Sequence, residues 1–325
     1  MNDFFKLAQQ VIAQTSSASA TGLPTRVLGR TNVRVSIMGI GGWHLGAIKE
    51  DSDAINLMHA AIDEGVTFFD NAWDYQDGHA EEVMGKALAM DRRRDKVFLM
   101  TKNCNRDYAG SMKCLEDSLR RLQTDHLDLW QFHECNYDND PDWIFETGGI
   151  EAALEAKRTG KIRFIGFTGH KDPRIHLNML AKRQDWDAAQ MPINLMDAHY
   201  RSFAKEVVPV CLANNTAVIG MKGLGGGWPN GRFLSHAGLT PEECYQFCLS
   251  MPVSVQVMGI NTLAQLKKDV QIVREFVPMT PAELESVLGR FKTVAGDGRH
   301  EQFKSSTDFD GPHHRIQHGF ANAAS

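Results

Sequence analysis

The chain has 325 residues, of which 42% are hydrophobic and 23% are charged, and its formal net charge at neutral pH is −5. This length fits either one large barrel or two ordinary domains. No run of about 18 apolar residues could span a bilayer, and the compact basic cluster Arg92-Arg93-Arg94 is typical of a solvated loop. We therefore expect neither a membrane span nor nucleic-acid binding.

The cysteines and the amino-terminal segment both bear on the cellular compartment. Six cysteines are present without a C-x-x-C pair, which is typical of buried apolar side chains in a reducing compartment. Residues 1–24 lack the basic start and the continuous apolar core of a secretory signal. We expect residues 1–24 to form a flexible extension and the protein to be cytoplasmic.

After residue 24 the sequence alternates short apolar runs with segments of helical periodicity. Residues 26–35 have strand-forming residues on both sides of a turn, which predicts a β-hairpin. Eight strands are predicted at residues 35–40, 67–70, 97–102, 127–133, 164–168, 188–193, 217–221 and 253–258. Helices are predicted at residues 53–65 and near residues 80–90, 107–122, 149–159, 173–183, 203–214, 240–250 and 263–275.

This alternation predicts an α/β fold, a (β/α)8 TIM barrel over residues 25–295 with an N-terminal β-hairpin. A doubly wound sheet is the alternative, but no G-x-G-x-x-G motif follows the first strand, where such sheets place their phosphate loop. The glycine-rich run from Gly223 to Gly227 follows the seventh strand instead, which is a frequent phosphate-binding position in barrels.

The C-terminal extension, residues 296–325, shows no periodicity. It contains His300, His313, His314 and His318 among Gly, Pro and Ser residues. We expect an extended segment on the surface or a disordered tail. Metal binding by such a tail is an alternative that its histidines leave open.

Three successive strands of the predicted barrel end on titratable residues. These are Asp70, Lys102 and His133, and the carboxyl ends of neighbouring barrel strands lie on one face, about 5 Å apart. Tyr75 follows in the loop after the second strand. A cation beside a tyrosine lowers its pKa, so we expect Lys102, held by Asp70, to make Tyr75 a stronger acid. We expect His133 to donate a hydrogen bond to a substrate oxygen or to relay a proton.

With these four residues the sequence resembles the aldo-keto reductase family, whose catalytic Asp, Tyr, Lys and His match Asp70, Tyr75, Lys102 and His133. The resemblance covers about residues 25–290. Further matching runs are Gly39-Ile40-Gly41-Gly42, Glu81-Glu82, Gly85-Lys86-Ala87-Leu88 and Gly160-Lys161-Ile162-Arg163. The resemblance implies an oxidoreductase that transfers hydride between nicotinamide C4 of NADP or NAD and a carbonyl or alcohol substrate, with Tyr75 as the proton donor or acceptor.

The resemblance also implies how the cofactor is bound, in an extended form across the barrel mouth. The matching positions are Gly42, Trp43, Asp70, Thr168, Gln190, Met221, Lys222, Gly223, Leu224, Gly225, Gly259, Asn261, Gln265 and Asp269. Three positions depart from the family pattern: Gly169 lacks an amide, Met221 replaces a stacking aromatic residue, and Asn261 replaces the arginine that grips a 2′-phosphate. We therefore expect a weaker NADP preference than is usual in the family.

The loops at the barrel mouth bear on the substrate. The substrate-binding residues implied are Trp43, His44, Trp73, Tyr75 and His133, and Asp74, His79, Tyr108 and Trp228 lie in nearby segments. Aromatic faces mixed with polar groups suit a polar or sugar-like small molecule better than an apolar one. We expect the protein to act on it as a monomer or homo-oligomer.

Two other functions fit parts of this pattern. Some barrels that resemble this family are nicotinamide-sensing regulatory subunits with little turnover, although no extended apolar or heptad segment here indicates a partner surface. A metal-dependent barrel hydrolase would use His44, His170, His133 and Glu134 as ligands. Because that function leaves a lysine and a tyrosine without a role, we predict no metal.

Overall fold

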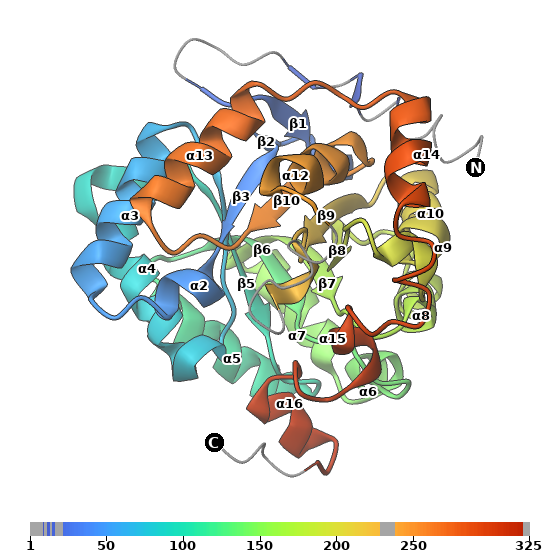
Figure 1. Ribbon diagram of the computed structural model, residues 1–325. Helices are drawn as coiled ribbons and strands as arrows, with labels where there is room; N and C mark the ends of the chain where they lie inside the picture. Colours follow the sequence, from blue (N-terminus) through green and yellow to red (C-terminus); the bar gives the residue numbers. More distant parts are fainter. Residues whose placement is uncertain (1–8, 10–11, 14, 17–21, 228–237, 321–325) are drawn as a thin grey trace.

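The computed structural model describes residues 9, 12–13, 15–16, 22–227 and 238–320. Within them, parallel strands close into a barrel in the order β10-β3-β4-β5-β6-β7-β8-β9. The strands are β3 (Met38–Gly41), β4 (Phe68–Asp70), β5 (Phe98–Asn103), β6 (Leu127–Phe132), β7 (Ile162–Thr168), β8 (Ala188–Pro192), β9 (Ala217–Met221) and β10 (Val255–Met258). Helices surround them (Figure 1). The predicted (β/α)8 fold is confirmed.

The helices bury apolar faces against the outside of the strands. They are α3 (Asp51–Asp63), α4 (His79–Ala89), α5 (Tyr108–Arg121), α7 (Gly149–Arg158), α8 (Pro173–Lys182), α9 (Phe203–Glu206), α10 (Val208–Ala213), α12 (Pro241–Ser250) and α13 (Leu263–Arg274). In α3, the buried residues Ala54, Leu57, Met58 and Ala61 have the spacing of one helix face. None of the described helices is long and apolar enough to cross a membrane.

Some helices differ from the prediction. Residues 203–214 were expected to form one helix, but α9 ends at Glu206, because Pro209 has no N–H to continue the hydrogen-bond ladder and instead lies in the first turn of α10. The sequence patterns also missed α2 (Gly42–Gly46), α6 (Asp140–Glu146) and α14 (Pro281–Gly289).

The N-terminal hairpin closes the end of the barrel opposite the candidate site. Strand β1 (Thr25–Val27) pairs antiparallel with β2 (Arg34–Ser36), as predicted. Leu28 and Val35 are fully buried in one apolar cluster with Phe68, Ala217 and Val255, which begin β4, β9 and β10. The first barrel strand therefore starts only at Met38, because the preceding residues belong to the hairpin.

The C-terminal segment, defined here as residues 296–320, lies over the loops that follow β6 and β7. It contains α15 (Gln302–Ser305) and α16 (Pro312–Gln317), which lie toward the lower side of the barrel in Figure 1. Asp310 is buried and accepts a hydrogen bond of 3.0 Å from Asn136 Nδ2, while the Gly311 amide donates one of 2.8 Å to Glu134 Oε2. The segment was expected to be extended or disordered, but it is partly helical and tied down by buried polar contacts.

Candidate active site

Lys102 is the centre of the polar group at the barrel mouth. It stands near the end of β5, is 1% exposed, and donates hydrogen bonds to Asp70 Oδ1 and to the Asn71 carbonyl at 2.7 Å. Its third contact is the Tyr75 hydroxyl, at 3.2 Å. A buried ammonium is tolerated only when it is paired and hydrogen-bonded, and Asp70 at the end of the adjacent strand β4 supplies the counter-charge.

Tyr75 folds back over Lys102, as expected from its place in the loop. The Lys102 ammonium lies 4.7 Å from the centre of the Tyr75 ring, and the rings of Trp43 and His133 flank it edge-on at 5.3 and 5.5 Å. The expected pKa shift was wrong in sign. Burial and then the negative charges of Asp70 and other nearby groups raise the pKa of Tyr75 well above its usual value, so this phenol stays protonated.

His133 follows directly after β6, and its backbone amide donates to the Asn103 carbonyl at 2.8 Å. Its side chain is buried, with Nδ1 3.0 Å from Asp74 Oδ1 and 3.4 Å from Cys104 Sγ. Burial lowers the pKa of His133 and outweighs the opposing effect of Asp74. Since the neutral ring prevails, one nitrogen can donate and the other can accept a hydrogen bond.

Gln190, a predicted cofactor position, contacts the predicted catalytic residue Asp70. Its Nε2 donates to Asp70 Oδ2 at 2.5 Å, and this bond orients the amide. Its Oε1 is buried without a hydrogen-bond partner among the described residues. An unpartnered buried acceptor is costly, so this oxygen is a natural contact for a ligand donor group. Thr168, at the end of the neighbouring strand β7, is buried as well.

The predicted phosphate loop leaves β9 through Met221, Lys222, Gly223, Leu224 and Gly225. Lys222 has φ of +55° and Gly225 of +79°, so the loop contains left-handed backbone that a glycine adopts easily. Burial lowers the pKa of Lys222, while Glu134 opposes that effect. The Lys222 ammonium lies 5.1 Å from the Phe303 ring of the C-terminal segment.

A second group of cofactor positions lies between β10 and α13. Gln265 Nε2 donates a hydrogen bond to the Gly259 carbonyl at 2.8 Å, and its Oε1 accepts one from the backbone N–H of Asn261 at 3.1 Å. The side chain of Gln265 therefore holds the other two positions together. Asp269 is 3% exposed, and its Oδ2 has no partner among the described residues. Burial raises the pKa of Asp269 to about 7.

The predicted substrate residues differ in their surroundings. Trp43 is 52% exposed, next to buried Gly42 at the start of α2. His44 packs against the cofactor position Gly259, because a Cβ there would lie 2.2 Å from the His44 ring. Trp73 packs edge-on against His313 of α16 at 5.3 Å and donates to an aspartate of α5, so the C-terminal segment covers it.

Of the other rim residues, His79 pairs with an aspartate of α3 at 3.1 Å, and Tyr108 is 45% exposed. Trp228 lies outside the described residues.

The ligand set considered for a metal hydrolase does not come together. His44 lies against Gly259, and His170 Nε2 pairs with Asp310 of the C-terminal segment at 3.2 Å. Glu134 Oε2 accepts a hydrogen bond from the backbone N–H of Gly311. Sequence patterns did not predict the contacts of Cys104 with His133, of Asp310 with Asn136 and of His314 with Asp74, because these contacts join segments that are distant in the sequence. The run Gly311-Pro312-His313-His314 in the tail was the one sequence feature that drew attention to this segment.

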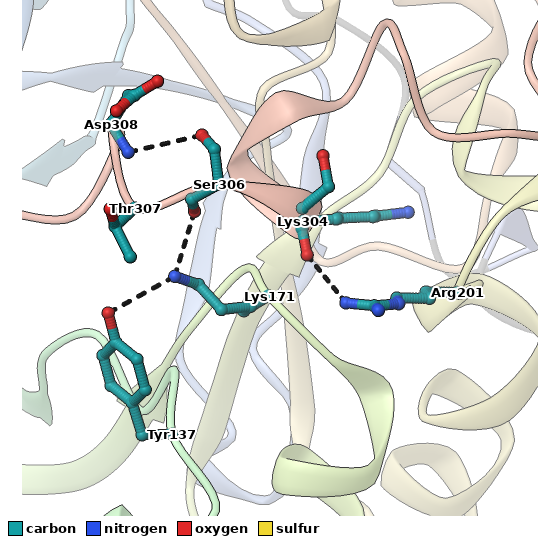
Figure 2. Close-up of a pocket in the computed structure, with 8 residues that line it drawn as sticks. Tyr137, Lys171, Arg201, Lys304, Ser306, Thr307 and Asp308 are labelled. Carbon is teal, nitrogen blue, oxygen red and sulfur yellow. Dashed lines mark hydrogen bonds between the residues drawn. The ribbon is translucent and has the colours of Figure 1, made fainter.

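A cavity of about 450 Å³ lies between the C-terminal segment and the loops after β6, β7 and β8. Figure 2 shows Lys171 reaching the Tyr137 hydroxyl and the Ser306 carbonyl across it, while Arg201 donates to the Lys304 carbonyl. None of the four predicted catalytic residues lines this cavity. It is therefore separate from the Lys102 group.

Known proteins share both the sequence and the fold. An L-galactose dehydrogenase of Arabidopsis thaliana is 32% identical over 160 residues, which are 46% of this chain and 49% of the relative. A Schizosaccharomyces pombe aldo-keto reductase named for NADP(+) is 29% identical over 236 residues, 66% of this chain and 64% of the relative. The matches thus span about half to two thirds of these relatives.

Among solved structures, the holo form of an aldo-keto reductase from Bacillus halodurans superimposes with a TM-score of 0.71 at 27% identity, covering 86% of this chain and 99% of that one. A sequence model described as the Aldo/keto reductase family matches residues 37–269, which is more than half of the chain. The chain therefore belongs to the aldo/keto reductase family.

Proposed function

We propose that this chain is an NADP-dependent oxidoreductase of the aldo-keto reductase type, acting on a carbonyl or alcohol group of a small molecule. The observation that carries the proposal is the contact between Lys102 Nζ and the Tyr75 hydroxyl, 3.2 Å apart, with the Lys102 side chain buried against Asp70. Membership of the aldo/keto reductase family supports the reaction type, and the S. pombe relative named for NADP(+) supports the cofactor.

The residues at the mouth fit a nicotinamide cofactor. Gln190 Oε1 is a buried acceptor without a partner among the described residues, next to Asp70, and suits the amide of a nicotinamide ring. The left-handed turn at Lys222 offers backbone amides and a half-buried cation for phosphates. When bound, NADP(H) supplies or accepts the hydride. Gly259, Asn261, Gln265 and Asp269 would hold the adenosine end.

Tyr75 is the proton donor in the direction of reduction. Its raised pKa keeps the phenol protonated at neutral pH, so a proton is available where an alkoxide develops. The Lys102 ammonium, held by Asp70, stabilises the phenolate that the transfer leaves behind. His133 flanks the Tyr75 ring and orients the substrate oxygen beside the phenol. Hydrogen-bond donors on the oxygen hold the carbonyl in reacting geometry.

A polar, sugar-like substrate fits the rim best. The exposed indole of Trp43 offers a flat face for C–H groups, and the nearby His44 offers a polar tip. The Arabidopsis relative named L-galactose dehydrogenase supports the same substrate class. We expect aldoses and related polar carbonyl compounds to be better substrates than long-chain or polyaromatic aldehydes.

The experiment is a titration of the purified protein with NADPH and NADH, followed by tryptophan fluorescence quenching, and then a panel of carbonyl substrates. We expect saturable binding of NADPH and reduction of polar carbonyls. If neither nucleotide binds, the proposed function is wrong. If NADPH binds but polyaromatic aldehydes exceed every sugar-like carbonyl in kcat/KM, the substrate class is wrong while the reaction type stands.

A further inference from the structure

A compact group of metal-binding side chains lies at the barrel mouth beside Tyr75. It brings together one potential ligand atom from each of four residues, all within 4.8 Å of one another: Asp74, Cys104, His133 and His314. Among the residues that the structure describes, no other group of three or more His, Cys, Asp or Glu side chains meets this condition. We propose that these four side chains bind a Zn²⁺ ion.

The distances within the cluster agree with a tetrahedral zinc site. Zinc bonds of about 2.0–2.3 Å place neighbouring ligand atoms roughly 3.3–3.8 Å apart. His133 Nδ1 lies 3.0 Å from Asp74 Oδ1 and 3.4 Å from Cys104 Sγ. His314 Nε2 lies 4.0 Å from the other carboxylate oxygen, Asp74 Oδ2, and within 4.8 Å of the remaining ligand atoms. His133 therefore already lies at nearly the required distance from two of the other ligands.

Unused hydrogen-bonding groups point to a missing ligand at this place. His314 is completely buried, yet neither of its ring nitrogens has a hydrogen-bond partner among the described residues. Asp74 Oδ1 faces the cluster as well, with His133 Nδ1 3.0 Å away. Leaving such groups unpaired costs about 1–3 kcal/mol each. A metal ion would bind one of the two His314 nitrogens and the Asp74 carboxylate at once.

The donor set selects zinc over harder cations. Two imidazoles, a thiolate and a carboxylate are ligands that Zn²⁺ prefers, whereas Mg²⁺ and Ca²⁺ require oxygen ligands. The carboxylate of Asp74 and the thiolate of Cys104 together balance the charge of the ion. Arg106 lies nearby, but its guanidinium is paired with Asp140 at 2.9 Å and does not neutralise the cluster.

The site would join the C-terminal segment to the barrel. His314 comes from α16, whereas the other three ligands follow β4, β5 and β6. Coordination through Nδ1 leaves Nε2 of His133 free to face a substrate and fixes which ring nitrogen carries the proton. Metal binding itself does not depend on the proposed reductase activity, so the two can fail separately.

The test uses the purified full-length chain, reduced and stripped of metal with a chelator, and Co²⁺ as a spectroscopic probe. We expect one Co²⁺ per chain, with the visible bands of a tetrahedral ion and a thiolate-to-cobalt charge-transfer band, and displacement by one equivalent of Zn²⁺. The variant Cys104→Ser should lose the charge-transfer band. The variant His314→Gln should bind Co²⁺ at least ~10-fold more weakly.

Matched controls are His313→Gln, which changes the neighbouring histidine of α16, and Cys135→Ser, which changes another buried cysteine. Both should keep the affinity and the spectrum. A wild-type chain that shows no saturable Co²⁺ binding would overturn the proposal. So would unchanged Co²⁺ affinity in both Cys104→Ser and His314→Gln. A loss of affinity in His313→Gln as large as that in His314→Gln would overturn it as well. If Cys104→Ser does not fold, Zn²⁺ should still raise the Tm of the wild type and not that of His314→Gln; equal rises would contradict the site.

Discussion

The Lys102 ammonium contacts Tyr75 twice, at 3.2 Å from the hydroxyl and at 4.7 Å from the ring centre. This places a fixed positive charge beside a phenol whose pKa is raised by burial. In the proposed reaction, the phenol would keep its proton until a substrate alkoxide develops, and the ammonium would then stabilise the phenolate.

Replacing Tyr75 by Phe removes only the proton donor. We expect kcat to fall by about 10²- to 10⁴-fold, the usual contribution of general acid catalysis, while the Kd of NADPH changes little. The measurement combines steady-state kinetics on a polar carbonyl with fluorescence titration of NADPH. Tyr200→Phe, a change at a tyrosine outside the predicted site residues, is the control and should leave both unchanged. A Tyr75→Phe enzyme with most of the wild-type rate would show that another group donates the proton.

We expect the pair of Lys102 and Asp70 to have both a structural and a chemical role, which two variants can separate. Lys102→Met leaves the Asp70 carboxylate buried and unpaired, and we expect it to lower the free energy of unfolding by about 3–5 kcal/mol. The double variant Lys102→Met, Asp70→Asn removes both charges and should recover most of that stability without recovering activity. Urea unfolding and kcat measure the two roles. Recovery of activity in the double variant would argue against a catalytic role for the ammonium.

Asn261 offers a test of how the cofactor is selected. An arginine at this position would add a charge-assisted hydrogen bond to the 2′-phosphate, worth about 1.5–3 kcal/mol. We expect Asn261→Arg to tighten NADPH binding by about tenfold or more and to leave NADH binding nearly unchanged. Asn261→Gln is the uncharged control. Equal tightening of both nucleotides would mean that the side chain does not approach the 2′-phosphate.

The buried carboxyl group of Asp269 should make the stability of the fold depend on pH. Burial raises its pKa to about 7, so the folded chain holds this proton more tightly than the unfolded chain, where the pKa is about 3.9. Its contribution to the free energy of unfolding is therefore lost as the pH rises from about 4 to 7.

We expect Asp269→Asn to raise the Tm at pH 8 much more than at pH 4.5, by an amount corresponding to a few kcal/mol at the higher pH. Thermal unfolding of the cofactor-free protein at both pH values measures this difference. Glu242→Gln, a change at a more exposed neighbouring acid, should show far less pH dependence. The same Tm gain at both pH values would show that the ionisation of Asp269 is not coupled to folding.

Asp310 fixes the C-terminal segment. Its carboxylate pairs with His170 and Lys171, and these partners hold its pKa below the usual range against the opposing effect of burial. Asp310→Ala should release the segment, so trypsin should cut at Arg299 or Lys304 about tenfold faster than in the wild type. Asp308→Ala, a change two residues earlier, is the control. Unchanged cleavage would mean that the remaining contacts suffice.

The barrel could be predicted from the sequence because its signals are local. Each strand is a short apolar run followed by a segment with apolar residues at helical spacing. The order of the strands along the chain then places Asp70, Lys102 and His133 at the same end of the barrel. The closure of the strands follows from their number and their parallel direction. Position in the sequence was thus enough to bring these side chains together.

The pKa of Tyr75 and the course of the C-terminal segment could not be predicted in this way. The sign of the pKa shift depends on burial and on acids such as Asp74 and Glu134, whose approach to the phenol is a property of the folded loops. The helix α16 has only six residues, too short for a periodic signal, and it is held by contacts such as that between Gln317 Nε2 and the Cys104 carbonyl at 2.9 Å. Such contacts between distant segments leave no local pattern.

The hairpin and the C-terminal segment cap opposite ends of the same barrel, and this matters for how the protein can be attached to a support. Leu28 and Val35 fill the barrel where the strands begin, whereas α16 lies where they end, beside Tyr75 and His133. A surface linkage made near Thr25 would leave the mouth facing the solution. A linkage made near Phe320 would turn the mouth toward the support and slow the access of substrate.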